Sequence, residues 1–304
     1  MTSVCISTST SLARELFRTV AKLKPALDKD LYDPHLQRSI REAIRAQTTD
    51  GFDWLVEEIR LRLVEPPYFA YVSGLQFDKA NLLLVGLTGA FGDVVDPYNQ
   101  AWSRLVRYIR PSTDRAVPSL GVLNENLHTD GTDWCCPNDL TCLLCVRQDQ
   151  NGGGRSQMMD LPSVKLEVET QIGRHAVDVM CDKSTPWRIA DELGGGIFRA
   201  PVLGAEEIRW LHYTIRSAVD CGLAQLSEDT AQMLQAVNEA LAKTSNAIHF
   251  LAEPGSLVLI NNKRCLHART AISTPRLSER LVLRTKVQRP NSVPPAQRPP
   301  AWHY

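Results

Sequence analysis

The fold of this chain is decided by the stretch Asn126-Leu127-His128-Thr129-Asp130-Gly131-Thr132. Side chains two residues apart point to the same side of an extended strand, whereas a helix would turn them about 200° apart. The histidine and the aspartate of this His-x-Asp motif therefore converge only if the chain is extended there. Far downstream lies the histidine that completes the pattern, His267, and Arg280 follows it thirteen residues later. This order of residue types is the most informative pattern in the sequence.

Two imidazoles and one carboxylate form the facial triad that holds non-heme Fe(II) and leaves positions open for other ligands. We expect His128, Asp130 and His267 to form such a triad. His212 and His249 are competing ligands because both lie in segments that read as strands, but neither has an arginine at a comparable spacing. A lone histidine is more often a surface or core residue than a ligand.

Arg280 and Arg284 are four residues apart, so on a strand they share one face, while the leucines between them face the other way. An arginine that points into a β core is costly unless an anion pairs with it. A bound carboxylate fits a guanidinium through two parallel hydrogen bonds. The alternative is a pair of surface arginines on an edge strand, and the pair alone would favour that alternative.

The chain has 304 residues, with 34 basic and 34 acidic side chains, and we interpret it as one domain. A net charge of zero argues against a nucleic-acid-binding protein. The best apolar stretch, Leu82–Phe91, is too short to span a membrane, and the N-terminus lacks the pattern of a secretory signal. We therefore expect a cytoplasmic protein with free thiols. Cys142 and Cys145 form a Cys-x-x-Cys pair, but they lie in an apolar strand, so burial is favoured over zinc.

Residues 10–64 have helical spacing of apolar side chains, and 66–287 have the short apolar runs and turn residues of a β core. A helix is expected over Ser227–Lys243, with Ser227 as its N-cap, and a glycine-broken helix over Asp78–Val94. This pattern predicts a mainly β protein with surrounding helices, built as a jelly roll or barrel. Residues 288–304 form a proline-rich tail. The expected strands are Tyr68–Val72, Tyr108–Arg110, Leu140–Val146, Ser156–Met159, Ala176–Met180, Ile208–Ile215, Ile248–Leu251, Ser256–Ile260 and Leu281–Val287.

The chain resembles the Fe(II)/2-oxoglutarate-dependent dioxygenases of the taurine dioxygenase and clavaminate synthase-like branch. Three segments carry this resemblance: Leu127–Thr132, Gly152–Ser156, and Asn262–Thr270 together with Arg280 and Arg284. The resemblance implies a single oxygenase domain over residues 1–287. Its core would be a distorted double-stranded β-helix, the cupin-like jelly roll, with helices packed outside.

The resemblance also implies the roles of single residues. His128, Asp130 and His267 would bind Fe(II) as the catalytic centre. Arg280 would hold the distal carboxylate of 2-oxoglutarate with help from the Ser156 hydroxyl. Arg284 would lie near the iron end of this co-substrate. O2 would be the other co-substrate, and succinate and CO2 would be released.

The implied reaction is hydroxylation or desaturation of an unactivated C–H bond, because halogenases of this superfamily replace the metal-binding carboxylate with a small residue. The substrate is expected to be a small molecule, such as an amino acid or an intermediate of specialised metabolism. Asn126, Asp133, Trp134 and Arg209 are candidates for contacting it. The alternative for Trp134 is the core, which is the commoner position of a tryptophan, and the alternative for Arg209 is the surface. Two alternatives stay open: a non-catalytic cupin-like protein that binds a carboxylate, and a zinc-dependent hydrolase that uses the same ligands.

Overall fold

The computed structural model describes residues 4–48, 50–96, 98, 104–112, 122–123, 125–273 and 279–289. Within these ranges the chain forms two main β-sheets and a separate hairpin of β8 (Pro186–Arg188) and β9 (Ile197–Arg199). In order, the path of the larger sheet is β1 (Cys5–Ser7), β2 (Phe69–Ser73), β11 (Leu257–Asn261), β6 (Leu140–Arg147), β13 (Leu281–Gln288) and β3 (Asp93–Val95), and β4 (Arg107–Ile109) also pairs with β13. The order of the smaller sheet is β10 (Ile248–Phe250), β7 (Ser156–Asp160), β12 (Cys265–Arg269) and β5 (Glu125–His128).

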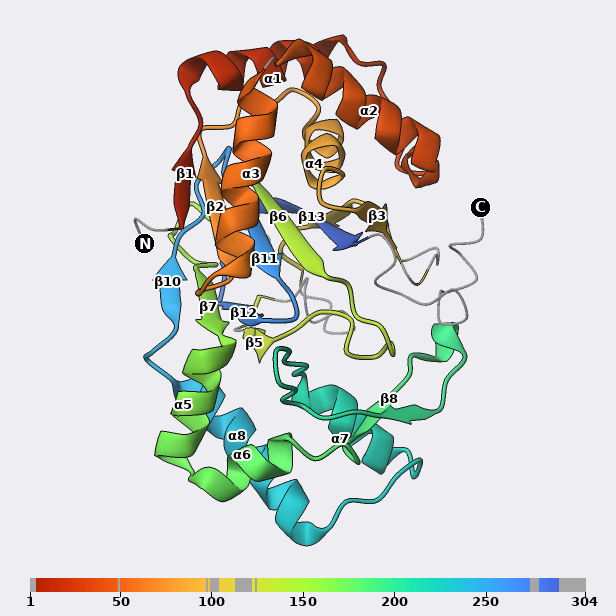
Figure 1. The fold of residues 1–304 in the computed structure, drawn as a ribbon, viewed down its shortest axis with the longest axis vertical. Coiled ribbons are helices and arrows are strands. Elements are labelled where there is room, and N and C mark those ends of the chain that lie inside the picture. The colour runs from red at the N-terminus through yellow and green to blue at the C-terminus, as the bar shows by residue number, and fades with distance from the viewer. Residues whose placement is uncertain are drawn as a thin grey trace.

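Four helices from the N-terminal part of the chain pack on the larger sheet (Figure 1). They are α1 (Thr10–Lys22), α2 (Pro34–Gln47), α3 (Asp50–Val64) and α4 (Ala80–Thr88). Ser9 caps α1 and Asp33 caps α2, because each side chain accepts a backbone N–H of the first turn. The helical prediction for residues 10–64 is confirmed. The helix expected over Asp78–Val94 is shorter than predicted, because its last residues form β3.

A second group of helices lies at the opposite end of the molecule, beside the smaller sheet (Figure 1). They are α5 (Leu161–Gln171), α6 (Arg174–Met180), α7 (His212–Asp220) and α8 (Glu228–Lys243). Ser227 caps α8 through the backbone N–H of Thr230, as the sequence predicts. None of the described helices combines the length and the apolar character that a membrane crossing requires.

Two of the expected strands are wrong. Residues 176–180 belong to α6, where Asp178 is exposed and its four neighbours are buried. A five-residue segment with four apolar side chains fits one face of a helix as well as a buried strand, so periodicity could not decide between them. Residues 208–211 are non-helical, but His212 begins α7. The other expected strands are present, and none of their ends is shifted by more than one residue.

The β core surrounded by helices is therefore confirmed in outline. The apolar core has two large clusters, one between the larger sheet and α1–α4 and one between the smaller sheet and α5–α8. A third, smaller cluster joins strands of the two sheets. Of the proline-rich tail, Gln288 ends β13 and Arg289 is described, and the rest lies outside the described residues.

Candidate metal centre

The three predicted metal ligands meet at the smaller sheet. His128 is the last residue of β5, and His267 lies directly opposite it on β12, with ring centroids 4.4 Å apart. Asp130 begins the turn after β5, and its Oδ2 lies 4.0 Å from Nε2 of His267. One ligand atom from each residue falls within 4.8 Å of the others. Within the described part of the chain, this is the one group of histidine, cysteine or acidic side chains that could hold a metal ion.

A hydrogen bond at His128 and burial at His267 favour the form of each imidazole that binds a metal. Nδ1 of His128 lies 2.8 Å from the carbonyl oxygen of Asn126, which makes Nδ1 the N–H donor and leaves the Nε2 lone pair available. Burial, together with the neighbouring His128, lowers the pKa of His267 to about 3. His267 is therefore neutral at physiological pH, which is the form that binds a metal. Its buried Nδ1 has no hydrogen-bond partner among the described residues.

The carboxylate of Asp130 is held from the larger sheet. Thr141 on β6 donates its hydroxyl to Oδ2 at 2.8 Å, and Arg284 on β13 donates to Oδ1 at 3.2 Å. Burial alone would raise the pKa of Asp130, but Arg284, followed by Lys286, lowers the pKa well below its usual range. Asp130 is therefore an anion. These two contacts place the site between the two sheets.

The side-chain amide of Asn262 holds the backbone of Asp130. Oδ1 of Asn262 accepts the Asp130 N–H at 2.8 Å, and Nδ2 donates to the Asp130 carbonyl oxygen at 3.0 Å. Nδ2 also donates to the carbonyl oxygen of Asn138 at 3.0 Å. Asn262 is only 1% exposed. Sequence reasoning missed the roles of Thr141 and Asn262, because no spacing rule links them to residue 130.

Arg280 packs against the glycine-rich turn that precedes β7. A Cβ atom on Gly154 would lie 2.7 Å from Nε of Arg280 and 2.6 Å from a methyl group of Ile272. Gly154 also has a φ of +70°, so both the space and the backbone require glycine. Burial, followed by the charge of Arg269, lowers the pKa of Arg280. Ser156 lies two residues after Gly154, is buried, and begins β7. The two residues predicted to hold the distal carboxylate, Arg280 and Ser156, therefore lie at the same end of this strand.

A cavity of about 850 Å³ opens beside the metal ligands. His128, Asp130 and Arg284 line it, and so do two of the predicted substrate contacts, Asn126 and Asp133. The two other predicted contacts have different positions. Trp134 is buried at 4% exposure, and Arg209 lies over the Phe198 ring and donates to the carbonyl oxygens of Trp134 and Cys135. Neither side chain lines the cavity, so Arg209 serves to fix the loop that follows Asp133.

The competing ligands are not at the site. His212 stacks on Trp210 in the first turn of α7, and His249 is exposed on β10. Cys142 and Cys145 are both buried, and burial raises the pKa of each thiol. Neither belongs to a metal-binding group of the described residues.

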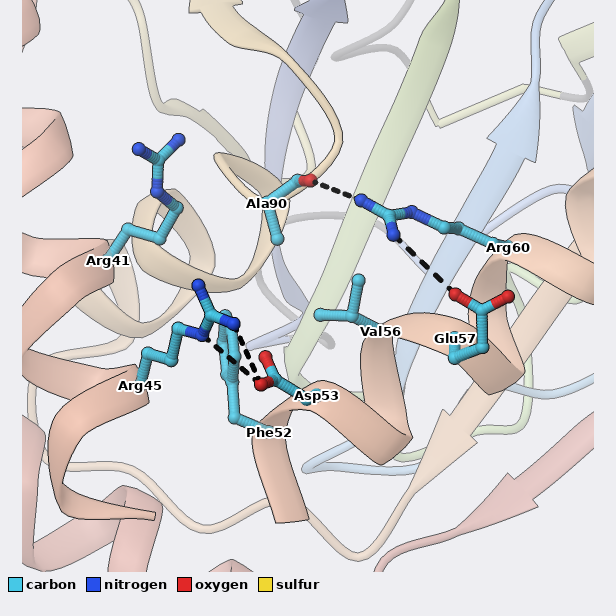
Figure 2. Close-up of a pocket in the computed structure, with 8 residues that line it drawn as sticks. All are labelled: Arg41, Arg45, Phe52, Asp53, Val56, Glu57, Arg60 and Ala90. Carbon is cyan, nitrogen blue, oxygen red and sulfur yellow. Dashed lines mark hydrogen bonds and ion pairs between the residues drawn. The ribbon is translucent and has the colours of Figure 1, made fainter. Parts of the chain in front are cut away.

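A second pocket, of about 450 Å³, lies among α2, α3 and the end of α4 (Figure 2). Its cationic side chains already have partners. Arg45 bonds the carboxylate of Asp53 at 2.9 Å, and Arg60 lies 3.5 Å from that of Glu57. Arg41 donates to a backbone carbonyl at 2.9 Å. The pocket offers no group of ligands or nucleophiles, so we assign it no chemistry.

No protein-family model matches the sequence, and no curated protein matches it. Solved structures are similar over nearly the whole chain. A structure of asparagine oxygenase in complex with Fe(II), 3-hydroxyasparagine and succinate has a TM-score of 0.75 at 16% identity, covering 94% of this chain and 93% of that one. The non-heme iron oxygenase OrfP, in complex with Fe, succinate and (3S)-hydroxy-L-Arg, has a TM-score of 0.71 at 18% identity, covering 93% of each chain. At this identity the likeness establishes the fold.

Proposed function

We propose that this protein is an Fe(II)- and 2-oxoglutarate-dependent oxygenase, which hydroxylates or desaturates a C–H bond of a small molecule. The observation that carries the proposal is the convergence of His128, Asp130 and His267 within 4.8 Å, in a chain that has the fold of the non-heme iron oxygenases. The proposal includes a double-stranded β-helix as the core, a single oxygenase domain over residues 1–287 and a cytoplasmic location.

The residues fit Fe(II). Two neutral imidazoles and one carboxylate are the donor set of the facial triad, and three ligands leave positions for a co-substrate and O2. The anionic Asp130 is fixed by Thr141 and Arg284, so its orientation does not depend on the metal. When bound, the metal supplies the oxidising chemistry that converts 2-oxoglutarate and O2 to succinate and CO2 while a C–H bond of the substrate is oxidised.

The protein's own residues would bind and orient the reactants. Arg280, with the Ser156 hydroxyl, would hold the distal carboxylate of 2-oxoglutarate, because a mostly buried guanidinium is stabilised by a carboxylate that pairs with it. Arg284 already bonds Asp130, so it would stabilise negative charge near the metal. The carboxylate at position 130 leaves no room for a halide and favours hydroxylation or desaturation.

An amino acid is the proposed class of substrate. The two similar oxygenases above are bound to hydroxylated asparagine and arginine. The cavity beside the metal ligands is lined by both cationic and anionic side chains, among them Arg107, Lys286 and Glu125. Such a lining suits a zwitterion. No observation favours a zinc-dependent hydrolase or a non-catalytic carboxylate-binding protein over the oxygenase.

The test is succinate release from 2-oxoglutarate with Fe(II) and O2, measured against a panel of the common L-amino acids. We expect at least one of them to stimulate release and to gain the mass of one oxygen or lose that of two hydrogens. His128→Ala and His267→Ala should each abolish release. His175→Ala is the control, because His175 is exposed and bonds Asp229 far from the site. Full turnover by both ligand variants, or activity with zinc and without O2, would contradict the proposal.

A further inference from the structure

Three basic side chains enter the cavity from one face of the larger sheet. Arg107 of β4 is the direct cross-strand partner of Arg284 on β13, and Lys286 is two residues further along β13. Cross-strand partners and residues two apart share a face of a sheet. All three side chains accordingly line the cavity of about 850 Å³ beside the metal ligands, whereas Arg280 does not line it.

Within the described part of the chain, Arg284 has a counterion, whereas the side chains of Arg107 and Lys286 have none. Arg284 bonds Asp130, which is itself a metal ligand in the proposed function. Among the described residues, the side chains of Arg107 and Lys286 form no hydrogen bond and no ion pair within 4.0 Å. The Lys286 ammonium lies 5.4 Å from the centre of the Tyr98 ring.

Three acidic groups of the cavity, those of Asp133, Glu125 and Asp191, are held by other residues, and Glu192, which also lines it, is exposed. Asp133 accepts the Tyr98 hydroxyl with both oxygens, at 2.7 and 2.8 Å. Glu125 lies 3.5 Å from Nε of Arg269, and Asp191 lies 3.1 Å from Arg188. As far as the structure describes the chain, Arg107 and Lys286 are thus the cations of the cavity with no bonded anion.

These two cations are also shielded from water. Burial lowers the pKa of Arg107, and the nearby Arg284 lowers it further. Burial lowers the pKa of Lys286 as well, against the opposing effect of Asp130. A partly desolvated cation without a bonded counterion is stabilised by any anion that reaches it. The cavity is open to a small molecule, so the anion can be part of the substrate.

We propose that Arg107 and Lys286 form an anion-binding subsite, which holds an acidic group of the molecule that is oxidised. The subsite is distinct from the co-substrate contact at Arg280 and deepens the proposed function, on which it rests. Carboxylate, sulfonate and phosphate groups share the chemistry that it recognises, namely terminal oxygens carrying negative charge. The substrate is accordingly an amino acid with an acidic side chain rather than a basic one, and the anion of that side chain occupies the subsite.

The experiment measures the binding of three acidic amino acids by calorimetry under anaerobic conditions. The probes are L-aspartate, L-cysteate and O-phospho-L-serine, which carry a carboxylate, a sulfonate and a phosphate, and L-asparagine is the neutral match for aspartate. Each is titrated into the metal-free protein and into its Fe(II)–2-oxoglutarate complex. We expect at least one acidic probe to bind more tightly than L-asparagine, and the tightest of the three identifies the group.

Arg107→Gln and Lys286→Gln should each weaken the binding of that probe by about 10- to 100-fold, the effect of losing one charge-assisted hydrogen bond. Lys286→Arg keeps the charge and should retain most of the affinity. Arg60→Gln is the matched control, since it removes an arginine from the other pocket (Figure 2). Circular dichroism verifies that each variant is folded, and Lys286→Arg keeps the test valid if a glutamine variant does not fold.

Two failures can be told apart. If no acidic probe binds, or if both glutamine variants bind the probe as the wild type does, the subsite is overturned. The proposed function is tested separately by the visible spectrum, in which the complex of the protein with Fe(II) and 2-oxoglutarate should give a weak charge-transfer band. If the wild-type protein gives no such band, the proposed function fails, whatever the probes do. If both glutamine variants give the same charge-transfer band as the wild type but no longer bind the probe, the result supports the subsite and the function together.

Discussion

Replacing Asn262 with alanine tests how strongly the metal centre depends on the backbone of Asp130. The Asn262 amide makes three hydrogen bonds, two to the Asp130 backbone and one to the carbonyl oxygen of Asn138. Each buried group that loses its partner costs about 1–3 kcal/mol. A water molecule can occupy part of the space left by the smaller side chain. We therefore expect the free energy of unfolding to fall by about 3 kcal/mol, the lower end of three such losses.

The more specific effect is on the metal. Asn262 holds the residue that supplies the anionic ligand, and the loss of such a support typically weakens metal binding about 10- to 100-fold. Fe(II) affinity is measured anaerobically by competition with a coloured chelator, at a temperature where the variant is fully folded. Denaturant unfolding of the metal-free protein gives the stability.

Asn261→Ala separates the two effects. Asn261 is also buried, and its side chain bonds the carbonyl oxygen of Leu63 and the N–H of Lys263. Its loss should therefore destabilise the protein without weakening Fe(II) binding. If Asn262→Ala binds Fe(II) within threefold of the wild-type affinity, or if both variants lose affinity equally, the positioning role of Asn262 is refuted.

The remaining predictions concern the co-substrate and the effect of pH. Arg280→Gln should raise the KM for 2-oxoglutarate about 100-fold, with Arg280→Lys between it and the wild type, in assays of succinate release; an unchanged KM would contradict the assignment. Gly154→Ala should lower stability by about 1–2 kcal/mol because of its positive φ, and should also raise this KM because the new Cβ meets Arg280. Gly152→Ala, with a φ of +75° and open space around it, should show only the loss of stability. Neutral His267 resists protonation down to about pH 3, whereas the unfolded chain binds that proton below about pH 6.5. The free energy of unfolding of the metal-free protein should therefore fall as the pH drops from 6.5 towards 3, by about 2 kcal/mol at pH 5. Denaturant unfolding at several pH values measures this fall, and the contribution of His267 should be missing in His267→Gln.

The sequence was sufficient to predict that His128, Asp130 and His267 come together, and the prediction for the first two used only local geometry and residue chemistry. The i, i+2 spacing of His128 and Asp130 predicts convergence in extended chain, and the two side chains do converge where β5 ends. His267 was chosen over His212 and His249 by its spacing from an arginine. The structure brings His267 alone of these three to the other ligands, through strand pairing that no local pattern encodes.

The supports of the site could not be predicted. Thr141 and Asn262 are ordinary polar residues at a strand and a turn, and their importance comes from contacts across 11 and 132 residues of sequence. The position of Arg209 could not be predicted either. From the sequence it could face the substrate or the surface, and in the structure it lies over Phe198 and donates to backbone carbonyl oxygens. In the same way, Ala176–Met180 is apolar enough for a strand, and only packing in the second core cluster selects the helix.

The most direct test of the central claim is the visible spectrum of the protein after anaerobic addition of Fe(II) and 2-oxoglutarate. If His128, Asp130 and His267 hold the metal and leave room for the keto acid, a weak charge-transfer band should appear in the wild type and in His175→Ala. The band should be absent in His128→Ala, Asp130→Ala and His267→Ala. A band that persists in all three ligand variants, or a wild-type protein that gives no band while it binds Fe(II), would contradict the account.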